Sequence, residues 1–222
     1  MRKVFITLWI SMMLVVAAIP AQGQNSDACA AMTQYWSDAM GYTIGRPFVR
    51  YASYTRQIVM MEGKFRQDLQ VVETDLAADH FYAELSPDCR YLAAALALPN
   101  GKSQMVAWDL LTNARISTIE NAPLAYRFHW SPVGNYTVAE SHDGQYLWHI
   151  PANQWNLLSA VSAGGNFDSY FTWDMTRGQL LAVPGDAAYS VHAYDLTTGQ
   201  VAAIYDSGTP AIPVSYVLSD DR

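Results

Sequence analysis

Short runs of β-branched and aromatic residues fill the chain from about residue 47 to its end. Gly, Asn, Asp and Pro interrupt these runs at short intervals, as they do where strands are joined by tight turns. The pattern predicts an all-β domain over residues 47–222.

Residues 26–41 have helical spacing instead. Ser26 is a suitable N-cap, Asp27 supplies an acidic first turn, and Gly41 stops the run. The apolar stripe of this helix would consist of Met32, Tyr35, Trp36 and Met40. Such a stripe is a packing face. We therefore expect residues 24–46 to form one short N-terminal helix followed by a linker.

An internal repeat organises the β region. A short segment in which an apolar or aromatic residue precedes a polar turn recurs at intervals of 45, 43 and 45 residues. Its copies are Leu85-Ser86-Pro87, Trp130-Ser131-Pro132, Trp173-Asp174-Met175 and Leu218-Ser219-Asp220. This spacing is typical of β-propeller blades, each built from four antiparallel strands.

Each unit has the same internal order of strands. The first has strands over 89–98, 104–108 and 115–119, the second over 136–140, 146–150 and 155–160, and the third over 179–183, 190–194 and 201–205. We expect two-residue hairpin turns at Asn100-Gly101 and Asp143-Gly144, since these residues accept left-handed conformations.

These units resemble the repeats of WD-repeat and TolB-like β-propellers. The segments SPDCRYLAAA and SPVGNYTVAE are similar to the Ser-Pro-Asp-Gly turn and following strand of those families, with Cys89 in place of the turn glycine. Trp108-Asp109 and Tyr194-Asp195 resemble the Trp-Asp pair that ends the third strand. The resemblance covers residues 50–219 and implies a fold, but not a function.

Only three units are complete. Residues 48–54, 57–61 and 69–73 look like three strands that lack a first strand, and Val214–Ser219 looks like a first strand with nothing after it. Two arrangements stay open. The two ends could close a ring of four blades, or the chain could be a truncated, open arc that exposes an edge and self-associates.

Residues 1–23 are typical of a secretory signal peptide. Arg2 and Lys3 precede an apolar stretch, and Ala21-Gln22-Gly23 offers a cleavage site after Gly23. We therefore expect a secreted or periplasmic protein with no stable membrane insertion after cleavage. In such a compartment Cys29 and Cys89 are candidates for a disulfide.

The charge of the chain argues against nucleic-acid partners. The formal net charge is −7, and it becomes −9 without Arg2 and Lys3, whereas nucleic-acid binding needs a basic patch. Hydrophobic residues make up 51% of the chain, enough for an ordinary core and too many for a disordered segment.

Motifs for catalysis, metal binding or cofactor binding are absent from the sequence. His142 and Asp143 are weak candidates for a surface site at a hairpin tip. His80 is expected in a structural hydrogen-bond network with Trp108, as the resemblance implies. Trp130 and Trp173 occupy the same repeat position, which favours packing, whereas Trp155 is the candidate for an exposed ring that could stack on a sugar.

Together these features predict an exported, non-enzymatic binding or scaffold module without metal or cofactor. Its loops would bind a protein or glycan partner. Two alternatives stay open: a secreted hydrolase or lyase with a loop-built site at His142 and Asp143, and the propeller part of a larger protein.

Overall fold

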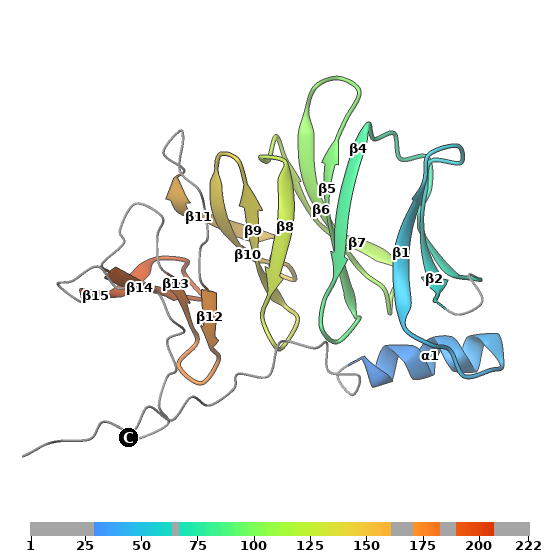
Figure 1. Cartoon of the computed structure of the whole chain (residues 1–222), viewed down its shortest axis with the longest axis horizontal. Coiled ribbons are helices and arrows are strands. Elements are labelled where there is room, and N and C mark those ends of the chain that lie inside the picture. The colour runs from blue at the N-terminus through green and yellow to red at the C-terminus, as the bar shows by residue number, and fades with distance from the viewer. Residues whose placement is uncertain (1–28, 64–66, 161–170, 183–189, 207–222) are drawn as a thin grey trace, which may run out of the picture.

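The computed structural model describes residues 29–63, 67–160, 171–182 and 190–206, which form one helix and four antiparallel sheets (Figure 1). We call the sheets blades 1 to 4 in chain order. The helix is α1 (Ala30–Met40). The predicted leader 1–23, Ser26, Asp27 and the predicted strand Val214–Ser219 lie outside the described residues.

Each blade is a meander in which successive strands are neighbours. Blade 1 has β1 (Pro47–Ala52), β2 (Gln57–Glu62) and β3 (Asp68–Glu73). Blade 2 has β4 (His80–Leu85), β5 (Tyr91–Ala97), β6 (Ser103–Asp109) and β7 (Ala114–Glu120). Blade 3 has β8 (Ala125–Trp130), β9 (Tyr136–Ser141), β10 (Gly144–His149) and β11 (Gln154–Ala160). Blade 4 has β12 (Phe171–Asp174), β13 (Gln179–Ala182), β14 (Ser190–Asp195) and β15 (Val201–Asp206). The all-β class and the four-stranded, propeller-like unit predicted from the repeat are confirmed.

The four blades lie in a row, with blade 1 at one end and blade 4 at the other (Figure 1). A closed ring of four blades would bring these two sheets side by side. The described residues therefore form an open arc, and the choice between the two arrangements stays a prediction, because the segment that would close a ring, Val214–Ser219, lies outside them.

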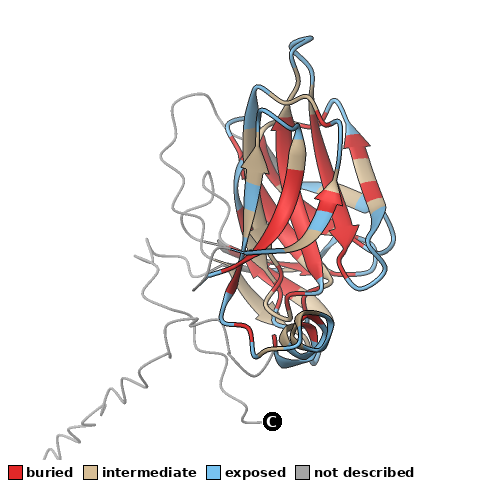
Figure 2. Ribbon diagram, turned by 90° about the vertical axis from the view of Figure 1, so that its right-hand side faces the viewer, coloured by how far each residue is buried: buried red, intermediate tan, exposed pale blue. Residues whose placement is uncertain are grey.

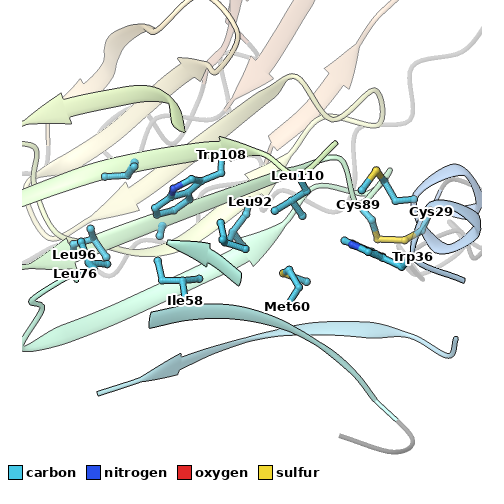
Figure 3. Packing of buried hydrophobic residues seen from close by; sticks show 14 of the residues in the cluster. Cys29, Trp36, Ile58, Met60, Leu76, Cys89, Leu92, Leu96, Trp108 and Leu110 are labelled. Atoms are coloured by element: carbon cyan, nitrogen blue, oxygen red, sulfur yellow. A yellow bond between two sulfur atoms is a disulfide. The ribbon is translucent and has the colours of Figure 1, made fainter. Parts of the chain in front are cut away.

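Apolar side chains fill the space between neighbouring blades, and the middle strands are the most deeply buried (Figure 2). Ile58 and Met60 of β2 pack against Leu92 of β5 and Trp108 of β6 in the cluster between blades 1 and 2 (Figure 3). Full burial of one such side chain is worth roughly 1.5–3 kcal/mol. The alternation of these side chains along each strand is what lets both faces of blade 2 pack.

Helix α1 covers one end of this cluster. Met32 and Trp36 are buried as predicted, while Tyr35 of the same stripe is 43% exposed. Gly41 ends the helix in the left-handed conformation with φ 75°. The Trp36 indole Nε1 donates to Gln70 Oε1 of β3 at 2.9 Å, so the helix is tied to blade 1 by more than apolar contact.

The two predicted hairpin turns differ in detail from the structure. In the first, a five-residue loop, Leu98–Lys102, joins β5 to β6, and only Gly101 of the predicted pair is left-handed, with φ 76°. In the second, the two loop residues are His142 and Asp143, because Gly144 already pairs with Ser141 across the ladder. The first prediction placed the turn correctly but with too short a loop, and the second placed it one residue too late, since the strand register, and not the Asn-Gly or Asp-Gly pair alone, sets its position.

Candidate functional site

A cavity of about 820 Å³ lies between α1, blade 1 and blade 2. The start of β1 lines it with Pro47, Phe48 and Val49, and the end of β4 lines it with Ala83, Glu84 and Leu85. Ile44, Gly45 and Arg46, which lead from the helix into β1, also contribute. The volume falls within the range of ordinary ligand-binding pockets.

The lining residues are mostly apolar, and Arg46 and Glu84 are the charged residues among them. Glu84 accepts a hydrogen bond from the phenol of Tyr82, two residues earlier in β4. Burial and this carboxylate both raise the pKa of Tyr82, so its hydroxyl remains a donor at neutral pH. Tyr82 packs in the cluster between blades 2 and 3, so this bond holds the Glu84 carboxylate on the blade 3 face of β4, away from the cavity.

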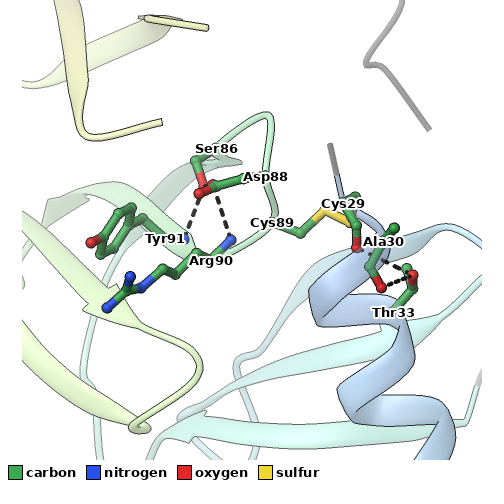
Figure 4. Close-up of a disulfide and its surroundings, with 8 residues drawn as sticks. All are labelled: Cys29, Ala30, Thr33, Ser86, Asp88, Cys89, Arg90 and Tyr91. Carbon is green, nitrogen blue, oxygen red and sulfur yellow. Dashed lines mark hydrogen bonds between the residues drawn. A yellow bond between two sulfur atoms is a disulfide. The ribbon is translucent and has the colours of Figure 1, made fainter. Parts of the chain in front are cut away.

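The predicted disulfide between Cys29 and Cys89 is present and borders the cavity (Figure 4). Cys89 lies in the β4–β5 turn, where its Cα is 5.0 Å from that of Cys29 at the start of α1. Ser86 in the same turn donates to Asp88 and accepts from the backbone N–H of Tyr91 at 2.9 Å. The turn and the helix thus form one cross-linked rim.

The edge of β1 that faces away from β2 is open among the described strands, because β2 is its one neighbour there. The Glu62 N–H donates to Gln67 O on the β3 side at 2.8 Å, so the Pro47–Glu62 pair is of the type without mutual hydrogen bonds. Since such pairs alternate along the ladder, Val49 and Tyr51 also direct their N–H and C=O groups away from β2. These groups form a row of donors and acceptors on the open edge.

One hydrogen bond recurs between successive blades, from an aromatic side chain of one blade to the last strand of the preceding blade. Trp108 of β6 donates to Glu73 of β3, Trp148 of β10 to Ser117 of β7, and Tyr194 of β14 to Leu158 O of β11, each at 3.1 Å. Because β7 and β11 are fourth strands, β3 also stands in a fourth-strand position. Blade 1 therefore consists of second, third and fourth strands, in agreement with the sequence interpretation, and its first-strand position is the open edge of β1.

The cavity lies at that first-strand position. First strands run antiparallel to second strands, so a first strand of blade 1 would end beside the start of β1, near Pro47 to Val49. The sequence indicated that blade 1 lacks a first strand, but it did not show that Ile44, Arg46 and Glu84 would enclose a space there.

The surface candidates from the sequence lie elsewhere. His142 and Asp143 are both exposed on the β9–β10 turn of blade 3, where the His142 ring lies 5.2 Å from that of Tyr126. Trp155, expected to be exposed, is half-buried and stacks on Tyr146 at 4.6 Å between ring centroids. The structure does not bring these three residues to the cavity.

The remaining candidates have structural surroundings. His80 is exposed in β4, and the Trp108 indole donates to Glu73, so the predicted network between His80 and Trp108 is wrong. Trp130 and Trp173 both pack against the apolar clusters between blades, as their shared repeat position predicts.

One buried acid of blade 3 lies close to a histidine. Glu140 Oε2 is 2.8 Å from His129 Nε2, within ion-pair distance, although the direction of the ring nitrogen does not meet hydrogen-bond geometry. Within the described ranges, no three His, Cys, Asp or Glu side chains are grouped closely enough to hold a metal ion. The cavity is therefore the candidate site.

No protein-family model matches the sequence, and no curated protein matches it by sequence. Many solved structures are similar to the chain, three of which are the following. The WD40 domain of coronin from Toxoplasma gondii is 12% identical with a TM-score of 0.45, and the match covers 72% of this chain and 44% of that one. TolB from Acinetobacter baumannii is 12% identical with a TM-score of 0.42, covering 80% and 46%. The dihydro-heme d1 dehydrogenase NirN, in complex with DHE, is 15% identical with a TM-score of 0.44, covering 72% and 34%. The chain spans less than half of each, and the likeness concerns the fold alone.

Proposed function

We propose that this protein is an exported, non-enzymatic binding module that holds an extended segment of a protein partner in the cavity beside β1. The observation that carries the proposal is the coincidence of the cavity with the open edge of β1. Apolar walls remove a ligand's side chains from water, and the edge groups of Val49 and Tyr51 can pair with its backbone.

The lining favours binding over catalysis. Its cysteines, Cys29 and Cys89, are joined in the disulfide, and the Glu84 carboxylate bonds Tyr82 on the other face of β4. A nucleophile with an adjacent base, which hydrolases of the common types need, is not among the residues that line it.

Export is part of the proposal. It rests on the leader-like residues 1–23 and on the disulfide, which persists in oxidising compartments. The described helix is too short to cross a membrane. N-terminal sequencing of protein recovered from the periplasm or medium should begin at Gln24, whereas an intact Met1 in the membrane fraction would contradict export.

Peptide selection tests the binding function directly. Phage-displayed peptides are selected against residues 24–222, and enriched peptides are synthesised and titrated by fluorescence polarisation. Phe48→Glu places a charge on the cavity wall at a residue that is already 39% exposed, and it should weaken binding at least tenfold. Tyr54→Glu is the matched control, because Tyr54 lies fully exposed on the β1–β2 turn.

Selection that yields no peptide sensitive to Phe48→Glu would contradict the proposal. Circular dichroism of both variants checks that they fold alike.

A further inference from the structure

The residues that follow β15, 207–222, which we call the tail, contain the first-strand motif predicted from the sequence. The place of this motif in the repeat indicates what fills the open edge of β1. We propose that a second copy of this chain supplies the missing strand: residues Val214–Ser219 of one copy pair with β1 of the other, reciprocally, so that two copies close one ring of eight blades. The inference rests on the proposed binding function of the cavity and names its partner.

The sequence of the tail carries the pattern of a first strand. In blade 2, Tyr82 to Asp88 reads YAELSPD, covering the end of β4 and its turn. Residues 215–221 read SYVLSDD, with Leu218, Ser219 and Asp221 in the places of Leu85, Ser86 and Asp88. In blade 2 the hydroxyl of this serine accepts from the backbone N–H of Tyr91, so the motif belongs to the step from a first strand to a second.

The way in which successive blades are connected indicates that the partner is another copy. After β3, six residues lead to β4, and after β7, four residues lead to β8; each connection crosses to the adjacent blade. After β15, seven residues lead to Val214, a connection of the same kind. By this rule Val214–Ser219 belongs to the blade that would stand next to blade 4, on the side away from blade 3.

The chain's own blade 1 is not in that place, since it lies at the opposite end of the row (Figure 1). The eight Cα–Cα steps from Asp206 to Val214 reach about 26–29 Å when fully extended. Neighbouring sheets are about 10 Å apart, so three spacings from blade 4 to blade 1 come to about 30 Å. The tail is therefore matched to an adjacent blade and short for its own β1.

The closed pair follows from the number of blades. The described residues of each copy form four blades, the first completed by the other copy, and propellers typically have four to eight. Two copies give eight blades, while three would exceed that range. In the pair every β1 edge is covered, which removes a surface that otherwise promotes open-ended association.

The mass of residues 24–222 in solution tests the inference. Size-exclusion chromatography with light scattering should give two chains per particle. Phe48→Glu in the cavity and Leu218→Asp in the tail should each reduce the mass to one chain. Tyr54→Glu and Thr209→Asp are the matched controls, because they add the same charges outside the proposed contact, and they should leave the pair intact.

Mixing the two single variants distinguishes a lost contact between copies from a failure of the variants to fold. Phe48→Glu retains its tail and Leu218→Asp retains its cavity, so an equimolar mixture has one intact junction and should again form particles of two chains. Photo-cross-linking of a Phe48→p-benzoylphenylalanine variant should join position 48 to residues 207–222 of a different chain, giving a product of twice the mass on a denaturing gel.

The results distinguish failure of the second-copy pairing from failure of the proposed binding function. A particle of one chain, or of more than two, overturns the pairing, and so does a cross-link between position 48 and the tail of the same chain. If the particle holds one chain and selected peptides still bind in a manner sensitive to Phe48→Glu, the binding function stands and the second copy is not its partner. If no peptide binds either, both proposals fall.

Discussion

Cys89 is held in a backbone conformation that suits glycine. Its φ is 58°, and the residues at the same place in the turns of blades 3 and 4 are Gly134, with φ 78°, and Gly178, with φ 64°. A residue with a Cβ costs roughly 1 kcal/mol in this region of φ. The disulfide to Cys29 offsets that cost, since closing a loop of 60 residues is worth on the order of 4 kcal/mol in the chain-entropy model.

Two variants without the disulfide separate these effects. Cys29→Ser with Cys89→Gly should be more stable than Cys29→Ser with Cys89→Ser by about 1 kcal/mol, because glycine relieves the left-handed backbone. Urea unfolding followed by tryptophan fluorescence measures the difference. Equal stability of the two would show that the turn relaxes when the disulfide is absent.

His149 of β10 makes folding sensitive to acid. Burial lowers its pKa below the ordinary value of 6.5, so the folded protein resists the proton that the unfolded chain accepts. Its contribution to stability is therefore complete above about pH 6.5 and is lost as the pH falls below that value. Tyr136 stacks on the ring at 4.3 Å, and this contact favours an uncharged aromatic at position 149.

His149→Phe should flatten that dependence. Between pH 7 and pH 5 the free energy of unfolding of the variant should fall less than that of the parent protein, since phenylalanine retains the stacking and takes up no proton. His80→Phe, at an exposed site in β4, is the control and should follow the parent curve. A parallel fall for His149→Phe and the parent would contradict this role of His149.

At the level of strands, the blades are joined by the recurring aromatic hydrogen bond as well as by apolar packing. Glu73 of β3 accepts from the Trp108 indole at 3.1 Å and from the Arg115 guanidinium at 2.8 Å. The Arg115 pair is partly exposed and contributes little. Trp108 is buried, so loss of its acceptor leaves an unsatisfied donor.

Glu73→Ala should therefore destabilise the protein by about 1–2 kcal/mol, mostly through the buried indole. Glu120→Ala, an exposed acid at the end of β7, should change stability by less than about 0.5 kcal/mol. Chemical unfolding of both variants measures the difference. A salt-sensitive loss for Glu73→Ala would indicate that the Arg115 pair, and not the indole, dominates.

The strand order was predictable because each blade repeats a turn with a physical cause. Ser86 and Ser131 both accept the backbone N–H of the residue five positions later, Tyr91 and Tyr136, so the Ser-Pro segments recur at the blade period. The helix was predictable from its stripe and from Gly41. The disulfide followed from having two cysteines and an expected oxidising compartment.

The site was not predictable in the same way. A cavity depends on how distant elements meet, and neither spacing nor residue type shows that the start of β1, the end of β4 and the helix enclose one space. The half-burial of Trp155 is of the same kind, because it depends on a diagonal contact across the β10–β11 pair, in which the ring stacks on Tyr146.

At the scale of the whole molecule, the open edge of β1 and the unplaced first-strand motif of the tail are complementary features of one chain. A propeller arc with a free edge exposes backbone donors and acceptors that have no strand partner, and proteins normally cover such an edge. The proposed exchange covers them with a strand of matching sequence. It also ties the stability of blade 1 to the concentration of the protein, because part of that blade comes from another molecule.

Thermal unfolding should therefore depend on concentration. A tenfold increase in the concentration of residues 24–222 should raise the Tm by about 2 °C, since mass action favours the pair and a chain of this size gains a few degrees per kcal/mol. Leu218→Asp should melt at one Tm across the same range, and Thr209→Asp should behave as the parent protein. Differential scanning calorimetry measures all three. A parent Tm that does not move with concentration would show that β1 is completed within one chain or stays open, because only a strand from a second molecule links folding to association.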